Sequence, residues 1–348
     1  MGSLHSYIAR QDNVAITHKL LSMYTEDTRR LLGNRRYTLI LDEAFETMTE
    51  VIITRHDFES LVARKIIKVS EDGTHLECLI SGYKGKYENE IALIQTGRVI
   101  VFNNRYLFWH YPPEFLDVFD EVIVLTYMFD CQYFAAYCQQ NNFKIRYIGV
   151  EQVRDGRYYF CSQAPHYSIM DKVPGLIEIC EDKKLNKIGA QRYSLSSSWF
   201  KSRGNAQRRK KLGNNIYTFL KRRCDATASN SMWSIYASGK DEIQKKGFIS
   251  SFVPFNSRAT NEHRDRDNLA YCVDIYCNPN VRNFFKVNNA QIDEDEYALS
   301  VMIQWIWRSA IRDGKPIRIY IPSLRMRLLL KYWLWTLKTD MEKNECTA

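Results

Sequence analysis

The chain has 348 residues, of which 45% are hydrophobic and 26% charged, and its formal net charge is +9. This composition is that of a globular protein long enough for two domains, and it excludes an intrinsically disordered chain. No run of 18 apolar residues occurs, and the first residues lack the apolar core of a signal peptide. We therefore expect a cytoplasmic protein that does not engage a membrane.

The first predicted elements are an extended segment at 14–16 and a helix that begins after Thr17. Thr17 and His18 would lie at a strand end, which is a suitable place to contact the backbone of a nucleic acid. Thr17 is equally suited to capping the helix through its hydroxyl group. A second helix is expected at 27–32, before a strongly apolar strand.

That strand, 38–41, runs directly into two adjacent carboxylates, Asp42 and Glu43. In α/β proteins the carboxyl ends of parallel strands form the edge where phosphates bind. There Asp42 would hold Mg²⁺ through its water shell, and Glu43 would polarise an attacking water. An acidic pair after an apolar run is also typical of a solvated strand end, so the motif alone has two interpretations.

Residues 48–114 are expected to form an insertion on the first domain. Within it, strands at 98–102 and 106–110 should pair as a hairpin around Asn103 and Asn104, because asparagine tolerates the left-handed backbone of a tight turn.

A second apolar strand is predicted at 122–125 and ends at Thr126. A helix at 131–140 and a strand at 144–150 follow it. Strand, helix and strand at this spacing indicate a βαβ unit and therefore a parallel sheet.

The second half of the chain is expected to form a second domain. Residues 268–276 are predicted as a helix, 293–311 as the longest helix, and 317–321 as a strand followed by a final helix to about residue 339. The expected division is a first domain over 1–165, a linker over 166–190, a second domain over 191–339 and a tail over 340–348.

The charge is concentrated in one segment. Between Lys201 and Arg223 there are nine basic residues and no acidic one, an excess equal to that of the whole chain. Aromatic residues flank or interrupt this segment, and the mixture offers phosphate neutralisation together with base stacking. We expect its dense run to bind nucleic acid, although a solvated basic face is the simpler alternative; the run is Arg208, Arg209, Lys210 and Lys211.

Within the predicted long helix, Gln304, Arg308 and Arg312 are spaced i, i+4 and i+8, so they would share one face. Two guanidinium groups beside a glutamine suit a phosphate chain, because their forked donors bind oxyanions. A solvated helix face is the alternative.

The order of these pieces resembles a superfamily 2, DEAD/DEAH-like helicase of the kind encoded by phages and plasmids. The resemblance covers roughly residues 10–335 and is most specific in its last two stretches. The stretches that carry it are VAITHK (14–19), LILDEA (39–44), VIVLTYMF (122–129), FVPFNSRATN (252–261) and QWIWRSAIR (304–312).

The resemblance implies an α/β protein with two RecA-like parallel-sheet domains that hydrolyses ATP with Mg²⁺ and moves along DNA. It implies catalytic roles for Asp42, Glu43, Gln304, Arg308 and Arg312, and a role for Thr126 in coupling the ATP site to the DNA site. It further implies nucleic-acid contacts, in addition to those of Thr17 and His18, by Arg258, Thr260 and Asn261.

The sequence departs from that family in two ways. The family's arginines lie four and seven residues after the glutamine, whereas here they lie four and eight residues after it. The family also needs GxxxxGK[ST] upstream of the acidic strand, and none of the 41 residues before Asp42 forms that motif. A chain encoded upstream would have to supply this P-loop; alternatively, the protein is a nucleic-acid-binding remnant without catalysis.

Overall fold

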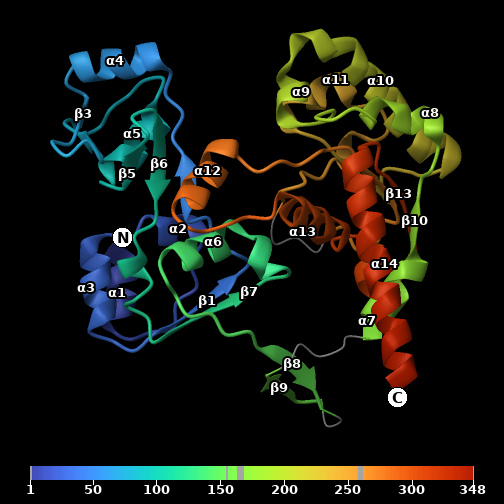
Figure 1. The fold of residues 1–348 in the computed structure, drawn as a ribbon, viewed down its shortest axis with the longest axis horizontal. Helices are drawn as coiled ribbons and strands as arrows, with labels where there is room; N and C mark the ends of the chain where they lie inside the picture. Colours follow the sequence, from blue (N-terminus) through green and yellow to red (C-terminus); the bar gives the residue numbers. More distant parts are fainter. Residues whose placement is uncertain (1, 154–155, 163–167, 258–261, 348) are drawn as a thin grey trace. The chain divides into compact units, whose positions relative to one another are not determined.

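The computed structural model describes residues 2–153, 156–162, 168–257 and 262–347, which divide into two compact units (Figure 1). Unit 1 comprises residues 1–144 and 278–292, and unit 2 comprises residues 145–277 and 293–348. The division falls at residue 144, ahead of the linker expected at 166–190. That expected linker contains α7 (Ser168–Leu176), β10 (Ile177–Ile179) and α8 (Lys183–Asn186), so it belongs to a folded unit.

Unit 1 combines small sheets with short helices. Its strands are β1 (Thr38–Asp42), β2 (Met48–Glu50), β3 (Ile67–Val69), β4 (Leu76–Cys78), β5 (Val99–Phe102), β6 (Tyr106–His110) and β7 (Glu121–Leu125). Its helices are α1 (Gly2–Ala9), α2 (His18–Ser22), α3 (Glu26–Gly33), α4 (Arg55–Ala63), α5 (Glu88–Gln95), α6 (Tyr133–Gln140) and α12 (Pro279–Val287), with 3₁₀ turns η1 (Pro113–Phe115) and η2 (Phe129–Cys131).

The two apolar strands of unit 1, β1 and β7, pair in parallel with Asp42 opposite Leu125. Their parallel direction agrees with the expectation. Strand β1 is not buried as the central strand of a covered sheet would be, because Ile40 is 61% exposed and only Leu41 of the apolar run is buried. Among the described residues β7 is the one strand paired with β1, and a two-stranded sheet leaves part of its surface uncovered.

The predicted hairpin is confirmed. Strands β5 and β6 pair antiparallel, with Phe102 opposite Tyr106, and β2 joins the other edge of β6. Asn103 and Asn104 between them have φ of 50° and 52°, the left-handed conformation that such a turn requires.

Helix α12 comes from the second half of the chain but packs in unit 1 (Figure 1). The ring of Phe284 lies 5.2 Å from that of Phe102 and 5.5 Å from that of Phe108. The carboxylate of Glu50 accepts hydrogen bonds from the side-chain amides of Asn278, at 2.6 Å, and Asn280, at 2.7 Å. Because Asn278 also caps the helix, Glu50 fixes the start of α12 on strand β2.

Unit 2 contains a four-stranded parallel sheet in the order β10-β13-β12-β11. Besides β10 its strands are β11 (Ser231–Ser234), β12 (Asn268–Tyr271) and β13 (Ile317–Tyr320), and a separate antiparallel pair is formed by β8 (Gly149–Gln152) and β9 (Tyr158–Cys161). Besides α7 and α8 its helices are α9 (Ser197–Lys201), α10 (Ala206–Tyr217), the π-helix η5 (Thr218–Arg223), α11 (Lys240–Ile243), α13 (Glu294–Ile306) and α14 (Leu324–Thr347). Shorter 3₁₀ turns are η3 (Lys187–Gly189), η4 (Arg203–Asn205), η6 (Ala237–Gly239), η7 (Ile249–Ser251) and η8 (Ala310–Asp313).

The sheet of unit 2 is covered on both faces. Ala270 and Cys272 join the apolar cluster formed by α9, α10 and η5, whereas Tyr271 lies 5.1 Å from the ring of Trp305 on α13. Alternate residues of β12 therefore face different helical layers, and all four of its residues are buried. This arrangement confirms an α/β fold with a parallel sheet.

Two predicted elements of unit 2 are wrong. The helix expected at 268–276 is strand β12, because a short apolar run buried on both faces has no periodicity that distinguishes strand from helix. The strand expected at 144–150 does not complete a βαβ unit with β7. It contributes β8, which pairs antiparallel with β9 across a turn in which Gly156 has a φ of 84°.

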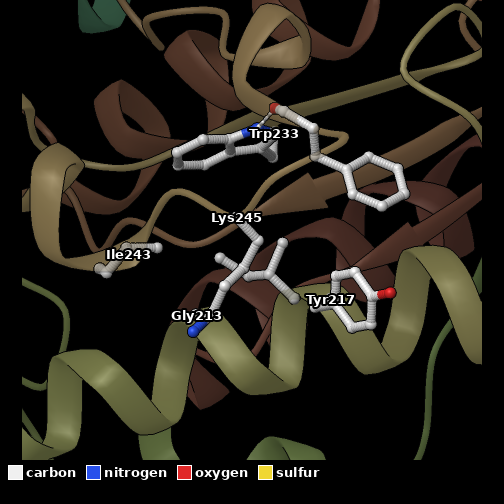
Figure 2. Close-up of a pocket in the computed structure, with 7 residues that line it drawn as sticks. Gly213, Tyr217, Trp233, Ile243 and Lys245 are labelled. Atoms are coloured by element: carbon white, nitrogen blue, oxygen red, sulfur yellow. Dashed lines mark hydrogen bonds between the residues drawn. The ribbon is translucent and has the colours of Figure 1, made fainter.

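Helix α10 packs tightly beneath a loop of unit 2. Figure 2 shows Gly213 of α10 below Ile243 and Lys245, at a cavity of about 10 Å³. The indole N–H of Trp233 closes the other side by donating to the Phe248 carbonyl at 2.7 Å. A Cβ atom on Gly213 would lie 2.6 Å from the Ile243 carbonyl oxygen, so only glycine fits here without a backbone shift.

We expect Gly213→Ala to lower the free energy of unfolding by about 1–3 kcal/mol, because overpacking outweighs the better helix propensity of alanine. Urea unfolding followed by tryptophan fluorescence measures the change. Asn214→Ala, at the exposed neighbouring position, should be neutral or slightly stabilising. Equal stability of the Gly213 and Asn214 variants would contradict the packing described above.

A partly buried histidine, His110 at the end of β6, makes unit 1 sensitive to acid. Burial lowers the pKa of His110 to about 4 from 6.5. Between these pH values the unfolded chain binds a proton that the folded chain does not, so stability falls as pH drops from 6.5 to 4. The loss should reach roughly 3 kcal/mol. Phenylalanine cannot take up a proton, so His110→Phe should flatten the pH dependence of the free energy of unfolding measured by chemical denaturation. An unchanged pH profile in this variant would contradict the role given to His110.

Candidate functional site

The two most specific stretches of the sequence, 252–261 and 304–312, are in contact in unit 2, because the indole N–H of Trp305 donates to the Val253 carbonyl at 3.0 Å. The segments next to them also meet, at one edge of the unit 2 sheet. Residues 262–267 lead into β12, and residues 307–316 lead into the neighbouring β13. The Ala310 N–H donates to the Arg266 carbonyl at 2.9 Å, and the Arg318 N–H donates to the Asp267 carbonyl at 2.8 Å. The guanidinium of Arg264 pairs with the carboxylate of Asp313 at 3.1 Å. Because β12 and β13 are parallel neighbours, the segments that precede them lie side by side at the amino ends of the two strands.

Charges of both signs meet at this edge, because the arginines of the two segments lie among Glu262, Asp265, Asp267 and Asp313. The Arg266 guanidinium is half-buried and donates to the Ser231 carbonyl at 2.8 Å, which fixes its orientation. Burial lowers the pKa of His263, and the nearby Arg266 and Arg308 lower it further. Two guanidinium groups of this edge, those of Arg266 and Arg308, are half-buried and are the groups best suited to an anion.

The predicted arginine face is not formed as a continuous helix. Helix α13 ends at Ile306, and the buried Ser309 has an extended ψ of −171°, while its hydroxyl donates to the Ile306 carbonyl at 2.6 Å. Gln304 is half-buried in the last turn of α13, Arg308 lies in the turn that follows, and Arg312 lies exposed in η8. The i, i+4, i+8 geometry therefore does not apply. Of the residues expected nearby, Arg258, Thr260 and Asn261 lie outside the described residues.

The basic segment spans the end of α9, the turn η4, helix α10 and the π-helix η5. Arg208, Lys210 and Lys211 are exposed, as nucleic-acid contacts require. Arg209 differs, because it is buried, pairs with Glu242 through Nε at 2.8 Å and donates to the Phe200 carbonyl at 3.0 Å. The predicted contact by Arg209 is therefore wrong, since the helix turns this residue inward.

Residues predicted in the first half cluster at the end of the β1–β7 pair. Thr126 follows β7, and the Glu43 N–H donates to the Leu125 carbonyl at 3.0 Å, while Glu43 has a left-handed φ of 78°. The exposed Asp42 ends β1.

The two helix-start residues of α2 complete this region. The Thr17 hydroxyl accepts from the Leu20 N–H at 3.2 Å and caps α2, which is the simpler of its two predicted roles. The ring of His18 lies edge-on to that of Phe45, with 5.7 Å between the ring centroids. Phe45 itself follows the acidic pair closely in the sequence.

Two further observations limit the kinds of site present. Among the residues that the structure describes, no three His, Cys, Asp or Glu side chains come together in a way that could hold a metal ion. None of the helices in the same part of the chain combines the length and apolar character needed to cross a membrane.

Comparison with known proteins identifies a relative that matches nearly the whole chain. It is 35% identical over 345 residues to the SPbeta prophage-derived uncharacterized protein YonV of Bacillus subtilis (strain 168), covering 96% of this chain and 82% of that protein. The chain belongs to the YonV family. The YonV C-terminal Rossmann-like domain matches residues 171–334, which contain the unit 2 sheet and α12. No solved structure matches the chain.

Sequence reasoning missed a buried ion pair in this YonV-family chain. Asp274 follows β12 and is 2% exposed; its carboxylate accepts from Arg325 of α14 at 2.9 Å and from the Tyr276 hydroxyl at 3.2 Å. Burial raises the pKa of Asp274, while Arg325 opposes the rise. The available signal was a single carboxylate within an otherwise apolar run, LAYCVDIY. With its partners occupied in this way, the pair serves to anchor α14 to the sheet.

A polar pocket of about 470 Å³ lies beside the π-helix of the same YonV-family unit. Arg318 of β13 lines it and is paired in register with Glu178 of β10, and Arg223 pairs with Asp182. Because its arginines face carboxylates, the pocket carries no surplus positive charge and does not favour a phosphate group.

The different positions of Arg209 and Lys210 give a direct test. Arg209→Ala should lower the free energy of unfolding by roughly 2–4 kcal/mol, because it removes a buried guanidinium and leaves Glu242 and two carbonyls without their donor. Lys210→Ala should change stability by less than about 0.5 kcal/mol. Thermal unfolding of both variants measures this; a Lys210 effect as large as that of Arg209 would contradict the assignment.

Proposed function

We propose that this protein acts as a nucleic-acid-dependent ATPase of the helicase or translocase type. The observation that carries the proposal is the contact between the two most specific stretches, 252–261 and 304–312, where the indole N–H of Trp305 donates to the Val253 carbonyl at 3.0 Å. In the helicases that the sequence resembles, the corresponding stretches face the nucleotide and the nucleic acid. In this chain the two stretches, separated by some 40 residues of sequence, come within hydrogen-bonding distance at Val253 and Trp305, and this contact supports the proposal.

On this proposal Arg308 and Arg312 stabilise the charge that develops on the transferred phosphate, and Gln304 contacts the nucleotide or the loops around it. Arg308 is the better candidate for the principal arginine because it is half-buried. A partly desolvated guanidinium interacts more strongly with an oxyanion. Arg312 is exposed and would act from the rim.

Unit 1 would supply the carboxylates. Asp42 is proposed to hold Mg²⁺ through water, and Glu43 to act on the attacking water. Thr126, which follows the strand paired with β1, would couple this edge to nucleic-acid binding. The hydrogen bond between the Glu43 N–H and Leu125 supports such coupling, because it ties the acidic pair to the segment that carries Thr126.

ATP is the proposed cofactor and DNA the proposed partner. Arg208, Lys210 and Lys211, exposed on α10, would neutralise phosphates of the nucleic acid, with Thr17, His18, Arg258, Thr260 and Asn261 as further contacts in the proposal. The prophage origin of YonV supports a role in phage DNA replication or recombination in the host cytoplasm. Two RecA-like domains, with a P-loop supplied by a chain encoded upstream, complete the proposal.

A second candidate is a nucleic-acid-binding protein that does not hydrolyse ATP. The exposure of Ile40 favours it, because the acidic pair then ends a partly solvated strand rather than the central strand of a covered sheet. No GxxxxGK[ST] sequence occurs in the chain, which points the same way.

The first experiment measures ATP hydrolysis and DNA binding by the protein, alone and with single-stranded DNA. Hydrolysis stimulated by DNA favours the ATPase. Tight, salt-sensitive DNA binding that is indifferent to ATP, without hydrolysis, favours the second candidate. Restoring a P-loop chain encoded upstream then separates an incomplete enzyme from an inactive one.

In the hydrolysing protein or complex, Glu43→Gln should abolish turnover and leave DNA binding intact. Arg308→Ala should lower kcat by roughly 10³-fold, the range found for arginines that stabilise phosphoryl transfer. Lys315→Ala, an exposed cation close to the same edge, is the matched control and should retain kcat. Unchanged turnover in the Glu43 variant would exclude the proposed catalytic role.

A further inference from the structure

The β8–β9 pair exposes an unusual amount of aromatic surface. Phe160 is 70% exposed, Tyr158 66%, Tyr147 56% and Tyr159 50%. Together these side chains expose roughly a few hundred Å² of aromatic surface on and beside the ribbon, more than isolated surface residues require. An exposed patch of this kind indicates a binding surface.

The register of the pair arranges these rings on its faces. Phe160 lies opposite Val150 and Tyr158 opposite Gln152, so both rings share one face of the two-stranded ribbon. Tyr159, opposite Glu151, lies on the other face. Residues i and i+2 of a strand are about 7 Å apart, a spacing that an extended single strand of nucleic acid can match with successive bases.

The charges around the rings are mainly positive. Lys144, Arg146 and Arg157 are exposed within or beside the pair, whereas Glu151 is the one acidic residue among 144–153 and 156–162. Aromatic faces combined with lysine and arginine are the two components of surfaces that bind single-stranded nucleic acid. A protein partner bound only through apolar packing would not call for this positive rim.

We infer that the β8–β9 pair is a stacking platform for the bases of single-stranded nucleic acid, with Tyr158 and Phe160 as its principal rings. The inference rests on the nucleic-acid-binding part of the proposed function, but it does not depend on ATP hydrolysis. It assigns base contacts to this pair, in contrast to the phosphate contacts proposed for α10.

The test uses the full chain and a fluorescein-labelled oligothymidylate of about 20 nucleotides, followed by anisotropy. A double variant, Tyr158→Leu with Phe160→Leu, keeps apolar volume but removes both rings, and it should lower affinity roughly tenfold or more. Tyr158→Phe retains the ring and should bind as the parent does. An oligonucleotide containing 2-aminopurine should lose its stacking-dependent quenching with the leucine variant but not with Tyr158→Phe.

Several outcomes would overturn the inference. Parental affinity in the leucine variant would show that the rings do not stack on bases. A variant that changes self-association in sedimentation, without changing oligonucleotide affinity, would assign the patch to a second copy of the chain. If the parent binds no oligonucleotide, both this inference and the proposed function fail. If Lys210→Ala with Lys211→Ala weakens binding and reduces its salt dependence while the leucine variant does not, only the platform fails.

Discussion

The two-sided burial of β12 is the constraint on which unit 2 depends. The strand is hydrogen-bonded to β11 on one edge and β13 on the other, and helices cover both of its faces. A strand held in this way cannot shift by one residue without moving every side chain to the wrong layer. Its two ends are therefore fixed, so the segment before it lies beside the approach to β13 and the segment after it buries Asp274 beneath Arg325.

The parts of the fold that could be predicted from the sequence are those decided by local chemistry. The left-handed turn at Asn103 and Asn104 fixes a hairpin without distant partners. Strand β13 is confirmed, and α14 begins where the final helix was expected, because Pro322 and Ser323 separate a compact apolar run from a long amphipathic one. The parallel pairing of β1 with β7 agrees with the expected parallel sheet, but the βαβ unit on which that expectation is based does not form.

The remaining features depend on contacts that the sequence does not display. The sequence of β12 is equally compatible with a helix, because burial on both faces removes the alternation of apolar and polar residues that marks a strand. The arginine spacing suggests one helical face, yet α13 ends at Ile306 and the backbone is extended at Ser309, so Arg308 and Arg312 do not share that face. Arg209 is indistinguishable from Lys210 in a basic run, and only the position of Glu242 decides that it turns inward. At the candidate site, therefore, the segments could be predicted but the orientation of individual side chains could not.

Helix α12 has a consequence for how the protein can be divided. The chain leaves unit 2 after Cys277, forms α12 on unit 1 and returns at Asp293, so three covalent connections join the units. The match to the YonV C-terminal Rossmann-like domain over 171–334 includes α12 and the residues that connect it to unit 2. A fragment cut to those limits would carry Phe284 without Phe102 and Phe108, and Asn278 without Glu50. Expressed alone, it would present an orphaned apolar helix to solvent, so separating the halves calls for excising 278–292 with a short linker rather than for a single cut.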